Sequence, residues 1–259
     1  MPRLCANLSM MFNEVPFLER FDAAAKAGFT AVEFLFPYEH SATELRARLA
    51  ANGLTQVLFN LPPGDWGAGE RGIACLPGRQ AEFRDGVRRG LDYAAALGCR
   101  LVHCMAGLAP AGVARETAAA LYVANLAWAA EQATAAGVRL AIEPINHRDM
   151  PRYLLHTVEQ GAAIAEALGP DRVGLQFDIY HCQITEGDLS RRMERFMPVI
   201  AHMQAADVPD RHEPGTGEIG WDFLFPRIDG LGYQGWIGLE YRPAGETVAG
   251  LAWRQRFGV

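Results

Sequence analysis

The 259-residue sequence is poor in several features that mark particular classes of protein. Its cysteines are odd in number, and no two of them have CxxC spacing: Cys5, Cys75, Cys99, Cys104 and Cys182. We therefore expect a reducing compartment, no disulfides and no thiolate zinc site. No stretch approaches the run of about 20 apolar residues that a membrane-spanning helix needs. The first residues, MPRLCANLSMMFNEVPF, also lack an apolar core followed by a small-residue cleavage site, so we expect a cytoplasmic protein with no membrane partner.

Basic residues are fewer than acidic ones. The chain has 24 Lys and Arg and 30 Asp and Glu, which gives a formal net charge of −6. Affinity for nucleic acid depends on Lys and Arg side chains that neutralise phosphates, so an acidic chain with no basic block argues against a nucleic-acid partner. Neither GxxxxGKS/T nor a strand-coupled GxGxxG occurs, and we therefore predict no phosphate-binding loop.

Half of the residues are hydrophobic, and many of them form short apolar runs that alternate with longer amphipathic stretches. The runs predict strands at 4–9, 31–36, 54–60, 100–104, 139–143, 173–178, 199–204 and 236–240. The stretches predict helices at 15–27, 43–51, 79–97, 115–136, 156–168 and 188–196, from about 220 to 229, and from about 247. Gly28, Gly53, Gly98 and Gly137 each end a predicted helix shortly before a strand. Eight such units with no linker predict an α/β fold, one (β/α)8 TIM barrel over residues 1–259, in preference to a doubly wound open sheet.

Polar side chains end four consecutive predicted strands: Glu143, Asp178, Gln204 and Glu240. In a TIM barrel the active site lies at the carboxyl ends of the strands, and neighbouring strands are about 4.8 Å apart. The four side chains are therefore expected to converge near the barrel axis. Three adjacent carboxylates repel one another unless a cation joins them, and hard oxygen ligands without thiolate favour Mg²⁺ or Mn²⁺. We predict one divalent metal ion.

Several segments resemble the hydroxypyruvate isomerase family of xylose-isomerase-like barrels. They are ANLSMMF at 6–12, VEFLFPY at 32–38, the segment 60–79, IEPINH at 142–147, FDIYH at 177–181, EPGTGEIGW at 213–221 and LEYRP at 239–243. The resemblance covers essentially the whole chain. It implies a single metal held by Glu143, Asp178, Gln204 and Glu240, with the two glutamates as the catalytic acid and base. One departure is Arg242, which stands where an EYKP motif would have lysine.

The activity that this resemblance implies is that of an intramolecular oxidoreductase, an aldose–ketose isomerase. It would interconvert hydroxypyruvate and 2-hydroxy-3-oxopropanoate (tartronate semialdehyde) of glyoxylate metabolism through a metal-stabilised enediolate, with the glutamates exchanging protons. Further residues are predicted to contact this small acid: His181, Asn60, Arg71, Arg211, His212 and Arg242. The Gly- and Pro-rich loop 61–78 is long enough to be a lid. By contrast, His103 lies within a strand and is more typical of a satisfied core histidine than of a ligand.

Three alternatives remain open at the level of sequence. The same metal and glutamates would serve a 2-oxo-tetronate isomerase or a ketose 3-epimerase, although the related epimerases usually carry histidine where this chain has Gln204. A DNA-repair enzyme similar to endonuclease IV shares the barrel, but that family holds three zinc ions with several strand-end histidines. A non-catalytic binding protein would keep the metal without turnover. A homo-oligomer is also open.

Overall fold

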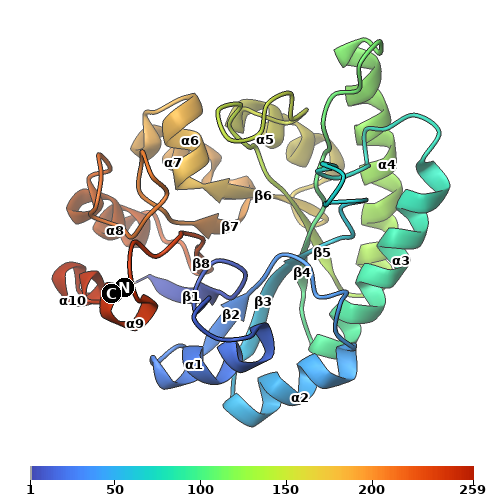
Figure 1. Ribbon diagram of the computed structural model, residues 1–259. Coiled ribbons are helices and arrows are strands. Elements are labelled where there is room, and N and C mark those ends of the chain that lie inside the picture. Colours follow the sequence, from blue (N-terminus) through green and yellow to red (C-terminus); the bar gives the residue numbers. More distant parts are fainter. Residues whose placement is uncertain (1) are drawn as a thin grey trace.

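The structure is a computed structural model that describes residues 2–259, and its eight parallel strands close into a barrel in sequence order (Figure 1). The strands are β1 (Arg3–Asn7), β2 (Ala31–Glu33), β3 (Thr55–Asn60), β4 (Leu101–His103), β5 (Arg139–Ile142), β6 (Val173–Asp178), β7 (Ile200–Gln204) and β8 (Trp236–Leu239). The last strand pairs with the first in the register Arg3↔Trp236 to Ala6↔Leu239, which closes the ring. The predicted TIM barrel is confirmed.

The helices lie on the outside of the ring, as Figure 1 shows. They are α1 (Arg20–Lys26), α2 (Ala42–Asn52), α3 (Gln80–Leu97), α4 (Arg115–Ala135), α5 (Val158–Leu168), α6 (Ile179–Thr185), α7 (Leu189–Phe196), α8 (Trp221–Gly230), α9 (Thr247–Gly250) and α10 (Trp253–Phe257). Two 3₁₀ helices, Phe17–Glu19 and Met197–Val199, precede α1 and β7. None of the helices in the described part of the chain is both long and apolar enough to cross a membrane.

Burial explains why the apolar runs become strands. Every residue of β6 is buried, since one face of the strand points into the barrel and the other packs against the helices. Gly53 and Gly98 end α2 and α3 in the left-handed conformation that glycine adopts without strain. The five cysteines are free thiols, and all of them are buried. The expectation of an unbridged chain is thus confirmed for the described residues.

Several boundaries differ from the prediction by a few residues, and the differences that bear on the site lie near the carboxyl end of the barrel. β2 ends at Glu33, whereas the apolar run suggested 31–36. β5 and β8 each end one residue before a glutamate, so Glu143 and Glu240 are the first residues of loops. Helix α6 was not predicted. It begins directly after Asp178, because the carboxylate of that residue accepts hydrogen bonds from the backbone N–H groups of Tyr180 and His181.

Candidate active site

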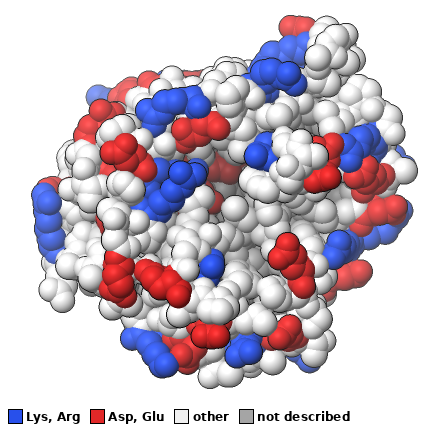
Figure 2. Space-filling model, in the orientation of Figure 1, with Lys and Arg blue, Asp and Glu red and all other residues white. Residues whose placement is uncertain are grey.

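A cavity of about 490 Å³ opens at the carboxyl ends of the strands. Its walls include the last residues of β3 and β4, Asn60 and His103, and the residues that directly follow β5 and β8, Glu143 and Glu240. Tyr180 and His181 of α6 and several loop residues complete the lining, among them Trp66, Arg71, Arg148, Arg211 and Arg242. Figure 2 shows a hollow near the middle of this face, with acidic atoms inside it and basic side chains around its mouth.

Three carboxylates are buried at this cavity: those of Glu143, Asp178 and Glu240 are each no more than 5% exposed. Burial raises the pKa of Glu143 well above its usual value, and the neighbouring charges of Glu240 and Asp178 raise it further. Burial likewise raises the pKa of Glu240 to about 8, against the opposing effect of Arg211. Among the described residues, Oε1 of Glu143 has no hydrogen-bond partner. The site therefore holds three acidic groups whose ionised forms are unfavourable without a counter-charge, and it leaves one carboxylate oxygen without a protein partner.

Arg211 is the cation that partly balances this charge. Its Nη2 lies 2.7 Å from Oε2 of Glu240 and 3.3 Å from Oδ2 of Asp178, so one guanidinium joins two carboxylates. The Arg211 backbone has φ of 59°, in the left-handed region that is unfavourable for arginine. Backbone hydrogen bonds to Asp207 and Arg242 hold it there. The prediction placed Arg211 near a substrate carboxylate; the structure places it at the cavity but pairs it with carboxylates of the protein.

His181 is buried beside the same carboxylates, and its hydrogen bonds define its tautomer. The amide oxygen of Asn146 accepts a hydrogen bond from the backbone of Asp149, so Nδ2 of Asn146 faces Nδ1 of His181 at 2.6 Å and donates to it. Burial lowers the pKa of His181 well below its usual value, and Arg211 lowers it further, so the ring is neutral. The remaining proton is on Nε2, which lies 3.6 Å from Asp178 and 3.8 Å from Glu143.

Gln204 belongs to a second polar group inside the barrel. Its Nε2 donates to Oε1 of Glu33 at 2.8 Å, and its Oε1 accepts from Nε2 of Gln176 at 2.6 Å. Sequence analysis missed Glu33, whose carboxylate also receives hydrogen bonds from Asn7, His202 and Cys5. Burial alone would raise the pKa of Glu33, but His202, Gln204 and Asn7 bring it below the usual value.

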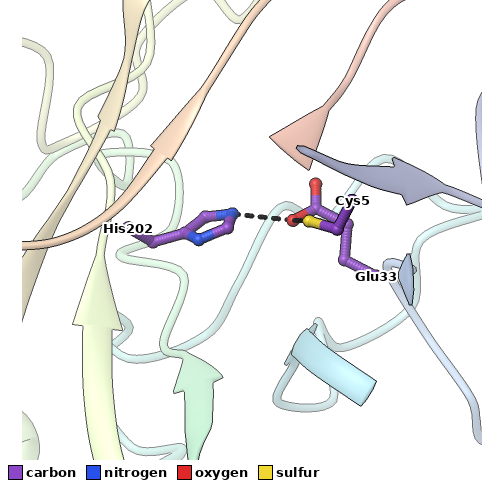
Figure 3. A group of neighbouring side chains, drawn as sticks. All are labelled: Cys5, Glu33 and His202. Atoms are coloured by element: carbon purple, nitrogen blue, oxygen red, sulfur yellow. Dashed lines mark hydrogen bonds and ion pairs between the residues drawn. The ribbon is translucent and has the colours of Figure 1, made fainter. Parts of the chain in front are cut away.

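Cys5, Glu33 and His202 point toward one another inside the barrel from β1, β2 and β7 (Figure 3). One candidate ligand atom from each of the three lies within 4.8 Å of the others, a spacing that would also suit a metal ion. Glu33 is already hydrogen-bonded on both oxygens, and Nε2 of His202 lies 2.7 Å from it. We therefore interpret this group as a hydrogen-bonded network that fixes the amide of Gln204. A glutamate inside the apolar run AVEFLF was the sequence signal that could have revealed it.

The remaining predicted substrate residues divide into two groups. Asn60, Arg71 and Arg242 line the cavity together with His181 and Arg211. The guanidinium of Arg71 lies 3.9 Å from the centre of the Trp66 ring, and because both residues line the cavity, the 61–78 loop reaches it. The structure does not place His212 with them, because its Nδ1 is 2.7 Å from the carbonyl of Arg242 and its ring joins two loops instead.

Arg148 and Tyr180 are among the lining residues that were not predicted. Arg148 lies at the mouth of the cavity, and its Nη2 donates to the Tyr180 hydroxyl at 3.1 Å and to the carbonyl of Pro209 at 3.0 Å. Arg148 directly follows the motif IEPINH, and Tyr180 lies within the motif FDIYH, and both motifs carried the family resemblance. A polar residue shortly after a strand end was the signal that could have identified them.

The sequence as a whole matches a family model described as xylose isomerase-like TIM barrel over residues 21–257. This chain belongs to that family. It is 57% identical to a 2-oxo-tetronate isomerase of Cupriavidus necator, over 98% of this chain and 97% of the relative, and 48% identical to a hydroxypyruvate isomerase of Escherichia coli, over 98% of each. The resemblance to the hydroxypyruvate isomerase family is thereby confirmed.

The fold of this family member is also seen in a crystal structure from Brucella melitensis that is described as an AP endonuclease, family 2. The two chains are 47% identical, each is covered over 99% of its length, and the TM-score is 0.96. A protein with almost the same backbone thus bears the name of the DNA-repair class that the sequence had left open, while the curated relatives are named as isomerases.

The buried carboxylates of this barrel fit a divalent metal ion. Three acidic groups share this buried site, and one carboxylate oxygen has no hydrogen-bond partner among residues 2–259. Together they form a set of hard oxygen donors of the kind that binds Mg²⁺ or Mn²⁺. Glu143, Asp178 and Glu240 would hold the ion. Oε1 of Gln204 accepts one hydrogen bond and keeps a second lone pair, so it remains available as the fourth predicted ligand. The full ligand set stays a prediction.

The raised pKa of Glu240 predicts how metal binding should depend on pH. A buried acid with pKa of about 8 in the folded state, against 4.5 as its ordinary value, favours folding while it is protonated. Without metal, this contribution is complete below about pH 4.5 and is lost as the pH rises through 8. A cation favours the ionised form. We therefore expect MgCl₂ to raise the thermal unfolding temperature by at least about 2 °C more at about pH 9 than at about pH 6.

The control is Glu240→Gln, whose amide does not ionise. In this variant the difference between the two pH values should shrink. An equal gain from MgCl₂ at both pH values in the unaltered protein would contradict the assignment of Glu240 to the metal site.

Proposed function

We propose that this protein is an isomerase, dependent on Mg²⁺ or Mn²⁺, that moves a carbonyl between C2 and C3 of a small 2-oxo-3-hydroxy acid. The observation that carries the proposal is the pair of buried carboxylates, Glu143 and Glu240, which reach one cavity from β5 and β8. Isomerisation requires that a proton leave one carbon and that a proton arrive at its neighbour. Two carboxyl groups of raised pKa at one site are suited to that exchange.

Two substrates share the reacting atoms of this proposal. Hydroxypyruvate, our first candidate, becomes tartronate semialdehyde when its carbonyl moves from C2 to C3. 2-Oxo-tetronate undergoes the same change at the same carbons and carries one additional CH₂OH group on C3. The higher identity to the Cupriavidus relative, 57% against 48%, supports 2-oxo-tetronate as the second candidate, and a cavity of about 490 Å³ has room for either acid.

The proton steps follow from the hydrogen bonds of the two glutamates. Glu143 has an oxygen with no partner in the described chain, so it is the group that takes the proton from C3. Glu240 accepts from Asn7 at 3.4 Å and from Arg211 at 2.7 Å, and it delivers a proton to C2. The hydroxyl proton on C3 is released to water and the oxygen on C2 takes one from water, so the number of protons is unchanged over the cycle. When bound, a divalent cation would supply positive charge that acidifies the C–H bond and stabilises the enediolate.

Arginines at the mouth of the cavity explain a preference for an acid. Arg71, Arg148 and Arg242 line it together with Arg211, whose guanidinium is already paired with Asp178 and Glu240. The three others are in a position to meet the substrate carboxylate, which offsets the repulsion between an anionic substrate and the acidic floor. With a net charge of −6, we do not propose nucleic acid as the physiological partner.

The first test is a panel of substrates with added Mg²⁺ or Mn²⁺. The panel contains hydroxypyruvate, 2-oxo-tetronate, the neutral ketose D-fructose and abasic-site DNA, each also assayed with a chelator. We expect kcat/KM for one of the two acids to exceed that for fructose by at least about 10²-fold, since a site built for a carboxylate leaves its arginines unpaired with a neutral ligand. Cleavage of the DNA, or equal turnover of fructose, would contradict the proposal.

The second test replaces each glutamate by its amide. Glu143→Gln and Glu240→Gln should each lower kcat by at least about 10²-fold, the usual effect of a positioned acid or base. Metal content is measured beside activity, because both residues are also predicted ligands. Glu186→Gln is the matched control, as its carboxylate pairs with Arg192 outside the cavity. A glutamate whose amide variant keeps its metal and turns over at the normal rate has no part in the proton transfer.

The third test follows the hydrogen itself. A proton held by a carboxyl group exchanges with water, so isomerisation in D₂O should place deuterium on the product carbon. A hydride transfer between the two carbons needs no base and would keep the original hydrogen. Complete retention of label from a substrate deuterated at C3, with no solvent deuterium in the product, would exclude the proposed path.

A further inference from the structure

His103 is the buried histidine of this barrel whose ring has been left without hydrogen bonds. It is the last residue of β4, it is 1% exposed, and it lines the cavity. In the described chain neither Nδ1 nor Nε2 has a hydrogen-bond partner. The other two buried histidines differ, because His181 pairs with Asn146 at 2.6 Å and His202 with Glu33 at 2.7 Å. The sequence predicted that His103 would be a core histidine with its hydrogen bonds satisfied, and this prediction is wrong. A buried polar group without a partner is unfavourable, so the ring lacks a hydrogen-bond partner that something other than the protein could supply.

The surroundings of His103 keep its ring uncharged. Burial lowers its pKa to about 3, and His202 contributes in the same direction. An imidazole ring has at least one N–H donor in either protonation state, so His103 can donate a hydrogen bond to a substrate oxygen that gains negative charge.

The position of His103 relates it to the proposed base. Its Nδ1 lies 3.7 Å from Oε2 of Glu143, slightly beyond hydrogen-bond distance. On the other side of the same carboxylate, Nε2 of His181 lies 3.8 Å from Oε1. The Glu143 carboxylate thus lies between two neutral imidazoles, and only His181 has a protein partner on its other nitrogen. A substrate with its C3 within reach of Glu143 would bring the carbonyl oxygen of the adjacent C2 close to the ring of His103.

We propose that His103 is a further catalytic residue, an imidazole that donates a hydrogen bond to the carbonyl oxygen on C2 of the substrate, the carbon next to the C3 from which Glu143 takes the proton. This inference rests on the isomerase activity proposed above. That oxygen gains negative charge as the enediolate forms, so the hydrogen bond is stronger in the transition state than in the substrate complex. The substrate oxygen supplies the hydrogen-bond partner that the His103 ring lacks in the protein. The imidazole proton stays on its nitrogen during the reaction.

The kinetic test compares His103→Phe with His103→Gln. Phenylalanine removes the donor and should lower kcat by about 10²–10³-fold, with a smaller change in KM, as loss of one preorganised donor does. Glutamine keeps an N–H donor and should recover part of kcat. Val102→Ala is the control, since Val102 is fully buried on the same strand and points to the opposite face. It should lower the unfolding temperature and leave kcat unchanged.

A second measurement does not depend on turnover. The ¹⁵N resonances of the histidine rings are recorded with Mg²⁺ and with tartronate, an unreactive hydroxy diacid, and the His103 signal is assigned by its absence in His103→Gln. We expect tartronate to shift one ring nitrogen of His103 and to leave those of His202 in place. Mg²⁺ affinity, measured by calorimetry, should be unchanged in both variants.

These readouts separate the two proposals. If the enzyme turns over neither acid but tartronate shifts the His103 resonance, the proposed reaction fails and the ligand contact stands. If an acid is turned over while His103→Phe keeps normal kcat, or if tartronate leaves the His103 ring unchanged, the role of His103 is overturned. A loss of kcat that Val102→Ala reproduces at equal loss of stability would also overturn it.

Discussion

The burial of negative charge at one end of the barrel is the constraint on which the rest of the site depends. Glu33, Glu143, Asp178 and Glu240 are all buried inside or at the end of the same ring of strands. Charges removed from water are unfavourable unless hydrogen bonds or counter-charges compensate them. The barrel compensates them to different degrees. Glu33 receives hydrogen bonds on both oxygens, Asp178 caps α6 and pairs with Arg211, and Glu240 pairs with Arg211. Glu143 is the least compensated of the four, and it is the one to which we assign the first proton transfer.

The position of Arg211 is in turn imposed from the loop after β7. Asp207, itself buried, accepts hydrogen bonds from the backbone of Val208, Gly215 and Ile219 and from the indole of Trp221. These contacts tie both ends of the loop to one carboxylate. They leave Arg211 in a backbone conformation that an isolated arginine would avoid. The counter-charge of the active site therefore depends on an aspartate that contacts neither the cavity nor the proposed substrate.

Sequence patterns identified the barrel because its strands and helices follow local rules. Glycines at helix ends, apolar runs of strand length and polar residues at strand ends are all visible within a few positions, and together they located Glu143, Asp178 and Glu240. The role of Glu33 was not visible in this way, because its hydrogen-bond partners Asn7, His202 and Gln204 come from strands that are distant in sequence. His103 was misjudged for a different reason. Whether a buried ring finds a partner depends on residues from β5 and β7 that are distant in sequence. Helix α6 was missed because its cap, Asp178, was interpreted only as a ligand.

The same charge balance accounts for the contrast between the two neighbours of Glu143. His181 is held on one nitrogen by Asn146, so its remaining N–H has a fixed direction toward the carboxylates and serves to orient them. Neither ring nitrogen of His103 has a hydrogen-bond partner in the described protein, so the ring is available to a partner on the substrate. In the proposed reaction the carboxylate that exchanges a proton with carbon has both kinds of neighbour. His181 would keep it in place, and His103 would stabilise the charge that appears on the substrate once the proton has left. Both rings must be neutral for this, because a protonated imidazole beside Glu143 would lower the basicity of the carboxylate. Burial makes the ionised carboxylates of the empty site unfavourable. The same burial lowers the pKa values of His103 and His181 and so favours their neutral forms.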